Sequence, residues 1–159
     1  MKIALGADHA GFELKEKVRE YLEKKGYQVQ DEGTFSNESV DYPDFAKKVG
    51  EDIVGQKADL GILVCGTGIG MSMAANKVPG IRAANVSSEF EAQFSREHND
   101  ANVLALGARV IDEPKAITIL ERWLNTPFAG GRHQRRVDKI MAIQRDEFEK
   151  MEQAAEKKG

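Results

Sequence analysis

The stretch DLGILVCGTGIGMSMAA, residues 59–75, predicts the central element of the fold. It opens with an apolar run of strand length, Leu60 to Val64, which ends at Cys65, the only cysteine of the chain. Glycines stand at positions 66, 68 and 70, and a segment of helical character follows at 71–75. The pattern is typical of a buried strand, a tight turn and a helix start. Such a helix start offers free backbone N–H groups to an anion and also favours a thiolate.

Segments of strand and helix character alternate five times around this stretch, which predicts a parallel sheet covered by helices on both faces. Strands are expected at 2–7, 27–31, 60–64, 81–86 and 103–106, and helices at 12–25, 44–55, 71–75, 89–97 and 113–124. A long charged helix is expected from about residue 132, with frayed residues at 152–159. We therefore expect a single domain over residues 1–159.

Composition limits the function classes. Hydrophobic residues make up 41% and charged residues 31%, and the formal net charge of −3 argues against electrostatic binding to nucleic acid or acidic membranes. A single cysteine cannot form an internal disulfide and fits a reducing compartment. The N-terminus does not resemble a signal peptide, and no apolar run approaches membrane-spanning length. We expect a cytoplasmic protein with no membrane or nucleic-acid partner.

Ligands of parallel α/β proteins bind where the loops after the strands converge. The residues just past the predicted strand ends are Asp8 and His9, then 65–70, then Ser87 and Ser88, and finally Arg109. We therefore expect these residues to face one crevice, although they lie far apart in the sequence.

The glycine pattern excludes three common motifs. It is not G-x-G-x-x-G, it is not followed by the lysine of a phosphate loop, and a phosphatase-type Cys-x5-Arg loop would need arginine where Met71 stands. Two interpretations remain, a tight turn alone or a loop whose backbone approaches a ligand oxygen. The role of Cys65 also has two interpretations, a small buried hydrophobic residue or a reactive group that faces a ligand.

The three histidines, His9, His98 and His133, fall in predicted loops or at a helix start. None belongs to a metal-ligand spacing such as H-E-x-x-H, so no metal is expected. Arg132 and Arg136 lie four residues apart on one face of the last helix. They are either a solvated basic turn or an anion site, and positive charge at a helix N-terminus favours the second interpretation.

These groups suggest a crevice with a thiol, backbone donors, histidines and arginines. Such a set suits proton transfer on a small phosphorylated or carboxylated substrate, with the backbone donors stabilising an oxyanion.

Six segments together resemble ribose-5-phosphate isomerase type B, in a family that includes allose-6-phosphate and galactose-6-phosphate isomerases. They are IALGADHAGFELK (3–15), DYPDFA (41–46), GILVCGTGIGMSMAANK (61–77), IRAA (81–84), REHNDANVLALGARV (96–110) and RHQRRVDKI (132–140). The resemblance, which extends over residues 1 to about 148, implies a Rossmann-like three-layer α/β/α sandwich, with a five-stranded parallel sheet in the order 2-1-3-5-4 and a long C-terminal helix. It also implies no cofactor and a homodimer with shared active sites, possibly assembled into a tetramer.

The family interconverts ribose 5-phosphate and ribulose 5-phosphate through an enediolate. By this resemblance Cys65 is the base that moves a proton between C2 and C1, Thr67 assists it, and His98 opens the sugar ring. The enediolate oxygen is expected to lie against the backbone of the glycine loop and the side chain of Asn99. The loop residues concerned are Gly66, Gly68, Ile69 and Gly70.

The resemblance also assigns the substrate contacts. Asp8 is expected to hold sugar hydroxyls and Tyr42 to line the pocket. The phosphate clamp is expected to comprise His9, Arg109, Arg132 and Arg136, with His133 nearby. His98 and the late arginines are expected to come from the neighbouring subunit relative to Asp8 and Cys65, and the helix from about 132 is expected to be exchanged or packed at the dimer interface.

Two other functions stay open from the sequence. One is isomerisation of a six-carbon sugar phosphate such as allose 6-phosphate, because the length of the pocket sets this choice. The other is a non-catalytic module that binds sugar phosphates, which has no need of the cysteine, the threonine and the ring-opening histidine.

Overall fold

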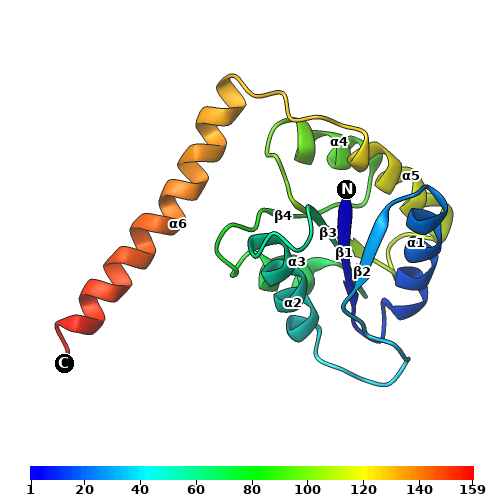
Figure 1. The fold of residues 1–159 in the computed structure, drawn as a ribbon, viewed down its shortest axis with the longest axis horizontal. Helices are drawn as coiled ribbons and strands as arrows, with labels where there is room; N and C mark the ends of the chain where they lie inside the picture. Colours follow the sequence, from blue (N-terminus) through cyan, green and yellow to red (C-terminus); the bar gives the residue numbers. More distant parts are fainter.

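The computed structural model describes all residues, 1–159, and shows five strands that alternate with helices (Figure 1). The sheet is entirely parallel, in the order β2-β1-β3-β5-β4, so the predicted fold class and strand order are confirmed. The elements are β1 (Lys2–Ala7), α1 (Phe12–Lys24), β2 (Gln28–Asp31), α2 (Tyr42–Val54), β3 (Leu60–Cys65), α3 (Ile69–Ala75), β4 (Ala83–Asn85), α4 (Glu89–Glu97), β5 (Val103–Gly107), α5 (Glu113–Leu124) and α6 (Arg132–Glu156).

Helices cover both faces of the sheet and produce two apolar cores. Side chains along a strand point alternately to its two faces. Accordingly Ile62 and Val64 of β3 pack with α1, α4 and α5, whereas Leu63 and Cys65 pack with α2 and α3. Because both faces are covered, every residue of β3 is buried. Cys65 therefore points to the α2/α3 side of the sheet.

Some element ends differ from the sequence prediction. Helix α2 begins at Tyr42 rather than 44, because Pro43 needs no N–H partner in the first turn. Strand β4 is limited to Ala83–Asn85, because it lies at the edge of the sheet and pairs only with β5. Helix α6 continues to Glu156, so the frayed end predicted from residue 152 is wrong.

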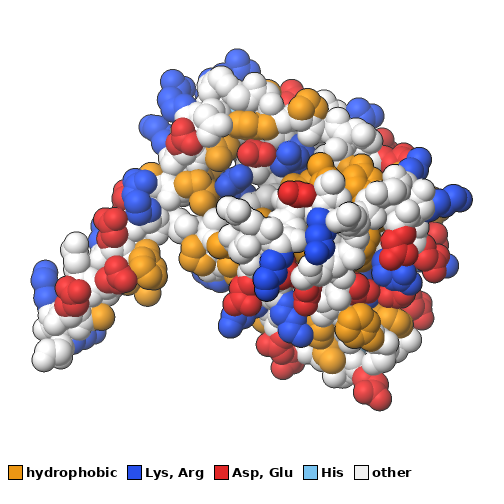
Figure 2. Space-filling view, in the orientation of Figure 1, with side chains coloured by type: hydrophobic (Ala, Val, Ile, Leu, Met, Phe, Trp, Pro, Cys, Tyr) orange, Lys and Arg blue, Asp and Glu red, His pale blue; other side chains and the backbone are white.

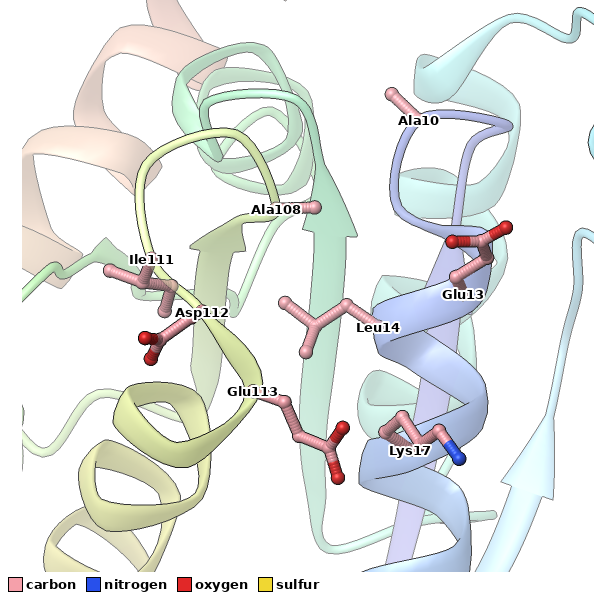
Figure 3. A pocket seen from close by; sticks show the side chains of 8 residues that line it. All are labelled: Ala10, Glu13, Leu14, Lys17, Ala108, Ile111, Asp112 and Glu113. Carbon is pink, nitrogen blue, oxygen red and sulfur yellow. The ribbon is translucent and has the colours of Figure 1, made fainter.

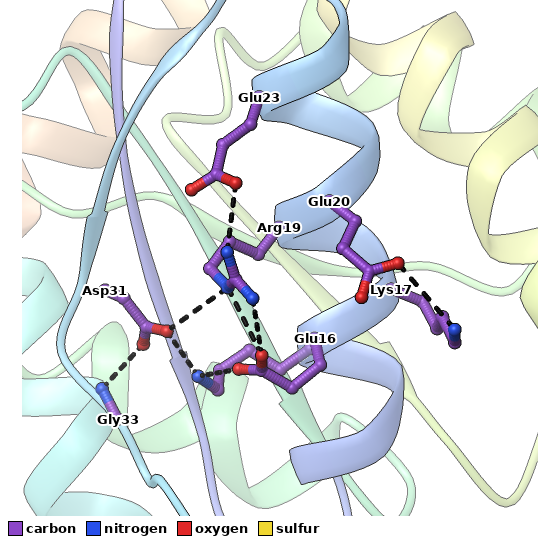
Figure 4. Close-up of polar contacts among 8 residues, drawn as sticks. Glu16, Lys17, Arg19, Glu20, Glu23, Asp31 and Gly33 are labelled. Atoms are coloured by element: carbon purple, nitrogen blue, oxygen red, sulfur yellow. Dashed lines mark hydrogen bonds and ion pairs between the residues drawn. The ribbon is translucent and has the colours of Figure 1, made fainter.

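One lysine of α1 is buried, although lysine is rarely buried unless its charge is paired. The side chain of Lys15 is 0% exposed, and its Nζ lies 2.6 Å from Asp31 Oδ2 and 2.9 Å from Glu16 Oε1. Asp31 also accepts a hydrogen bond from the Gly33 N–H, and Arg19 pairs with Glu16 (Figure 4). This network ties α1 to the end of β2 and to the loop that leads to α2.

Helix α6 projects away from the rest of the chain, and the C-terminus lies apart from the sheet and its other helices (Figure 1). Apolar side chains lie on the side of α6 that faces the rest of the molecule, and a hollow separates this helix from the rest (Figure 2). The exposed apolar residues of this helix are Ile140, Ile143, Phe148 and Met151. Near its middle, α6 and the strand edge line a hollow of about 550 Å³. None of the helices combines the length and the apolar character needed to cross a membrane.

A pair of carboxyl groups between β2 and α2 gives the fold a pH-dependent contact. The amide of Gln30 donates to Glu32 Oε1 at 2.8 Å and to Asp52 Oδ2 at 3.0 Å. Burial, together with the hydrogen bond and charge of Glu32, raises the pKa of Asp52 to about 6. The folded chain therefore holds this proton more tightly than the unfolded chain, and the resulting stabilisation is lost as the pH rises from about 4 to about 6.

Replacing Asp52 with asparagine is expected to stabilise the protein at neutral pH, because the amide stays uncharged where the carboxyl group ionises. The free energy of unfolding should rise by about 1–2 kcal/mol at pH 7.5, and the gain should disappear near pH 4. Urea denaturation at both pH values and a fixed protein concentration measures the change. Glu51→Gln, at an exposed position of the same helix, is the control. A gain equal at both pH values would contradict the ionisation of Asp52.

Candidate active site

The thiol of Cys65 lies at the carboxyl end of the central strand, directly beneath the glycine loop. Cys65 is 4% exposed, and its Sγ accepts a hydrogen bond of 3.1 Å from the Gly68 N–H. The next side chain, Thr67, is exposed, and its Oγ1 accepts from the Ile69 N–H at 3.2 Å. A backbone donor therefore faces the sulfur, and a hydroxyl group lies two residues away on the open side of the loop.

Close packing explains why the loop is rich in glycine. Gly68 has a φ of 80°, in the left-handed region that favours glycine, and a Cβ there would lie 2.5 Å from Asn85 Oδ1. A Cβ on Gly70 would lie 2.6 Å from the ring of Tyr42. The glycines therefore serve a tight turn and also let Asn85 and Tyr42 approach the loop.

Four further predicted residues lie at the same end of the sheet. Asp8 is buried and accepts a hydrogen bond from the Gly11 N–H at 3.0 Å. His9 Nδ1 accepts from the Val40 N–H at 3.2 Å, which leaves Nε2 of a neutral ring as the N–H donor. Tyr42 lies over Gly70, and the guanidinium of Arg109 lies against Gly66, within 3.1 Å of a Cβ placed there.

Ser87 and Ser88, which the sequence placed in the same crevice, directly precede α4, and Ser88 is the N-cap of this helix. Ser88 Oγ accepts a hydrogen bond from the Glu91 N–H, and the hydroxyls of both serines bond to the Glu91 carboxylate. They form a helix cap, because serine before an acidic first turn satisfies the free N–H groups. Asn85, which sequence reasoning missed, contacts the loop from this side. The position of Asn85 at the end of β4 could have indicated that it contacts the loop.

The remaining predicted residues form a second group around His98. The ring centroids of His98 and His133 lie 4.1 Å apart with an interplanar angle of 9°, and the Phe94 ring lies 4.6 Å from that of His98 at a tilt of 57°. His133 lies in the first turn of α6, between the exposed side chains of Arg132 and Arg136. Asn99 is also exposed and follows His98 in the chain. The second group is therefore His98, Asn99, Arg132, His133 and Arg136.

The second group is electropositive. Partial burial, followed by the charges of His98, Arg132 and Arg136, lowers the pKa of His133. The lowered pKa keeps the imidazole neutral at neutral pH, whereas a bound anion would oppose these charges and raise it again. The arrangement suits an anionic ligand more than a cation.

The two groups lie at opposite ends of the sheet in one chain. Cys65 pairs with Gly107 at the carboxyl end of β5, whereas His98 precedes β5, whose amino end follows Asn102. Strand β5 is five residues long, or about 17 Å at 3.4 Å per residue. No hydrogen bond or ion pair joins a side chain of one group to the other. Within a single chain these groups therefore do not form one crevice, because α4 runs antiparallel to the strands and returns His98 to their amino ends. The expectation that His98 and the late arginines come from the neighbouring subunit stays a prediction.

A separate pocket of about 320 Å³ lies between the starts of α1 and α5 (Figure 3). Its lining includes Glu13, Lys17, Asp112 and Glu113, and none of the predicted site residues. It lies on the other face of the sheet from Cys65, because α1 and α5 cover that face. No three His, Cys, Asp or Glu side chains lie close enough together to hold a metal ion.

The fold and its two polar groups define a parallel α/β protein whose loops carry a thiol, backbone donors and an arginine-histidine cluster. Comparison with known proteins assigns the family. The Ribose/Galactose Isomerase family matches residues 3–140, and the chain belongs to this family. The resemblance expected from the sequence motifs is therefore confirmed.

Individual relatives agree with this assignment. The chain is 50% identical over 143 residues to ribose-5-phosphate isomerase B of Escherichia coli K12, covering 90% of this chain and 96% of that protein. The structure of the Clostridium thermocellum ribose-5-phosphate isomerase B has a TM-score of 0.91 and 53% identity, covering 92% of this chain and 99% of that one. The Mycoplasma genitalium enzyme, solved with bound ribulose-5-phosphate, has a TM-score of 0.86 and 44% identity, covering 91% and 96% of the two chains.

Proposed function

We propose that the protein is an aldose-ketose isomerase that interconverts ribose 5-phosphate and ribulose 5-phosphate, with Cys65 as its base. The observation that carries the proposal is the Cys65 thiol beneath a loop of backbone N–H groups at the carboxyl end of the central strand. Membership of the Ribose/Galactose Isomerase family supports the reaction class, and the E. coli relative supports the five-carbon substrate.

The chemistry follows from these positions. The Cys65 thiolate takes the proton from C2 of the open-chain aldose, and negative charge develops on O1. Backbone N–H groups of the glycine loop stabilise this enediolate oxygen, because fixed donors are most effective where charge develops. A proton passes from O2 to O1 with Thr67 assisting, the thiol returns its proton to C1, and the ketose forms. Proton transfer by a positioned base contributes about 10²–10⁴-fold to the rate.

The complete site comes from two subunits. About 17 Å of strand separates the ends of the sheet at which Cys65 and His98 lie, and a five-carbon sugar phosphate does not span that distance. In a two-fold symmetric dimer, the His98 group of each subunit can lie next to the Cys65 group of the other subunit. The dimer then has two equivalent complete sites. The projecting α6, with exposed apolar residues along it, provides the surface for a second copy. His98 of one subunit then opens the ring of a sugar held by Asp8 of its partner.

The phosphate is held by the basic side chains. His9 and Arg109 lie with Cys65, whereas Arg132 and Arg136 belong to the His98 group, so the clamp also closes across the interface. Guanidinium groups suit the geometry of phosphate oxygens. His133 lies beside Arg132 and Arg136 and completes the basic surface.

Replacing Arg136 with alanine is expected to raise KM about 10-fold or more and to change kcat little. A phosphate grip acts equally on the bound substrate and on the transition state, so its loss appears in binding. Steady-state kinetics with ribose 5-phosphate measures both constants, and Lys139→Ala on an exposed part of the same helix is the control. Loss of kcat with an unchanged KM would contradict the assigned role.

A side-by-side assay of ribose 5-phosphate and allose 6-phosphate tests the substrate. We expect ketose formation from the five-carbon substrate at a kcat/KM at least about 10-fold higher, since a poorly fitting substrate loses binding energy. A higher kcat/KM with allose 6-phosphate would show a six-carbon isomerase. Binding of both sugar phosphates without any ketose would show a non-catalytic binding module.

A further inference from the structure

The turn after His98 is contacted by Arg82, an arginine that directly precedes β4. The Arg82 guanidinium donates through Nε to the carbonyl oxygens of Asn99 at 3.1 Å and Asp100 at 3.2 Å. Its Nη2 donates to the Asp100 carbonyl at 2.8 Å and lies 3.5 Å from the Asp100 carboxylate. Arg82 belongs to the IRAA motif at 81–84, to which the proposed chemistry assigns no role.

This turn is held in an unfavourable backbone conformation. Asp100 has a φ of 44°, in the left-handed region, which costs free energy for residues other than glycine, although less for aspartate than for most. Arg96 supports the same turn from α4, with its Nη1 at 2.9 Å from Asp100 Oδ1 and 2.6 Å from the Ala101 carbonyl. Two arginines therefore fix a turn that the local sequence does not favour.

Arg82 also connects the turn to α6. Its Nη1 lies 3.4 Å from Met141 Sδ, and its backbone N–H donates to Asn102 Oδ1 at 2.7 Å. The Asn102 amide in turn donates to the Gly80 carbonyl at 2.9 Å. One residue therefore contacts both segments that carry the His98 group, the 98–102 turn and helix α6, whose first turn contains His133.

We propose that Arg82 is a positioning residue that aligns His98 for opening of the sugar ring. The inference rests on the proposed role of His98. Arg82 does not reach the substrate itself, because its guanidinium is occupied by the backbone of the turn. By fixing the carbonyls at 99 and 100, it sets the direction in which the half-exposed His98 side chain leaves the end of α4. Stacking on His133 then fixes the plane of the ring.

A double-mutant cycle on kcat/KM for ribose 5-phosphate tests this inference. Arg82→Gln removes the charge and most of the donors, and we expect it to lower kcat/KM by about 10- to 100-fold, since a misplaced catalytic group loses much of its effect. The single variant His98→Asn should lower kcat/KM by more than Arg82→Gln does. In the His98→Asn background the Arg82→Gln change should cost less than about 2-fold, because a residue that acts through His98 has nothing left to align.

Arg122→Gln is the matched control, because this exposed arginine of α5 contacts only Gln93 and Glu89 and should leave kcat/KM unchanged. Circular dichroism and size-exclusion chromatography establish that each variant is folded and assembled. If Arg82→Gln does not fold, Arg82→Lys takes its place in the cycle, since lysine keeps the charge but cannot direct two separate N–H groups to the two carbonyls.

The outcomes separate the two hypotheses. An equal loss from the Arg82 substitution in both backgrounds, or no loss in the wild-type background, overturns the role of Arg82 and leaves that of His98 intact. An unchanged kcat/KM in His98→Asn overturns the proposed role of His98 and this inference with it. A loss confined to the background that keeps His98 supports the alignment.

Discussion

Replacing Cys65 with alanine is expected to lower kcat by at least about 10³-fold while the protein still folds and binds ribose 5-phosphate. The removed group is the proposed base, and a positioned base supplies about 10²–10⁴-fold of the rate. Cys65 is small and buried, so alanine should change the packing little. Ketose formation measures turnover, and calorimetric titration with the sugar phosphate measures binding.

The control for this variant is Met73→Ala, at an exposed position of the short helix that follows the glycine loop. It should retain wild-type turnover. Near-normal turnover of Cys65→Ala would exclude the thiol as the base, and attention would then move to Asp8, the buried carboxyl group at the neighbouring strand end. Loss of binding together with turnover would indicate a structural role for the sulfur.

Mixing two strongly impaired variants, Cys65→Ala and His98→Asn, is expected to restore activity, and this result tests the shared site. If Cys65 and His98 meet only across the interface, a dimer of one Cys65→Ala chain and one His98→Asn chain contains one site with both substitutions and one intact site. When equal amounts of the two variants reassociate at random, half of the dimers are hybrids, and each hybrid has one intact site out of two. About one quarter of the wild-type activity should therefore return.

The experiment requires exchange of subunits, achieved by unfolding the two variants together and refolding them. Each variant refolded alone is the control and should keep its own low activity. Activity of the mixture no greater than the average of the two variants would show that Cys65 and His98 act within one chain. That outcome would also require a rearrangement of α6 and α4, because β5 separates the two groups in the structure.

Much of the fold followed from short-range patterns. The apolar runs at 2–7 and 60–64 predicted β1 and most of β3, since a strand between two helical layers is apolar throughout, and the helix expected at 89–97 agrees with α4. The buried Lys15 could not be predicted in this way. Its burial depends on Asp31, which the chain brings to it from another element.

The sequence also predicted the members of the candidate site better than their arrangement. The rule that loops after parallel strands converge correctly placed Asp8, His9, Arg109 and the glycine loop together. It also named Ser88, whose hydroxyl is used to cap α4, because a serine three residues before a glutamate satisfies the free N–H groups of a helix start. Asn85 was missed since its contact with Gly68 joins two strand ends that are not neighbours in the sequence.

By itself, the sequence determined the alternation of strands and helices, the thiol at the end of the central strand and the glycine turn over it, because these depend on residues adjacent in the chain. The family resemblance assigned Cys65 and His98 to different subunits. Only the tertiary structure decided that the two lie at opposite ends of the sheet in one chain and that α6 projects away from the other elements. The physical reason is the return path of each helix. A helix between two parallel strands must run back to the amino end of the sheet, so residues after a strand and residues before one cannot meet in a single chain.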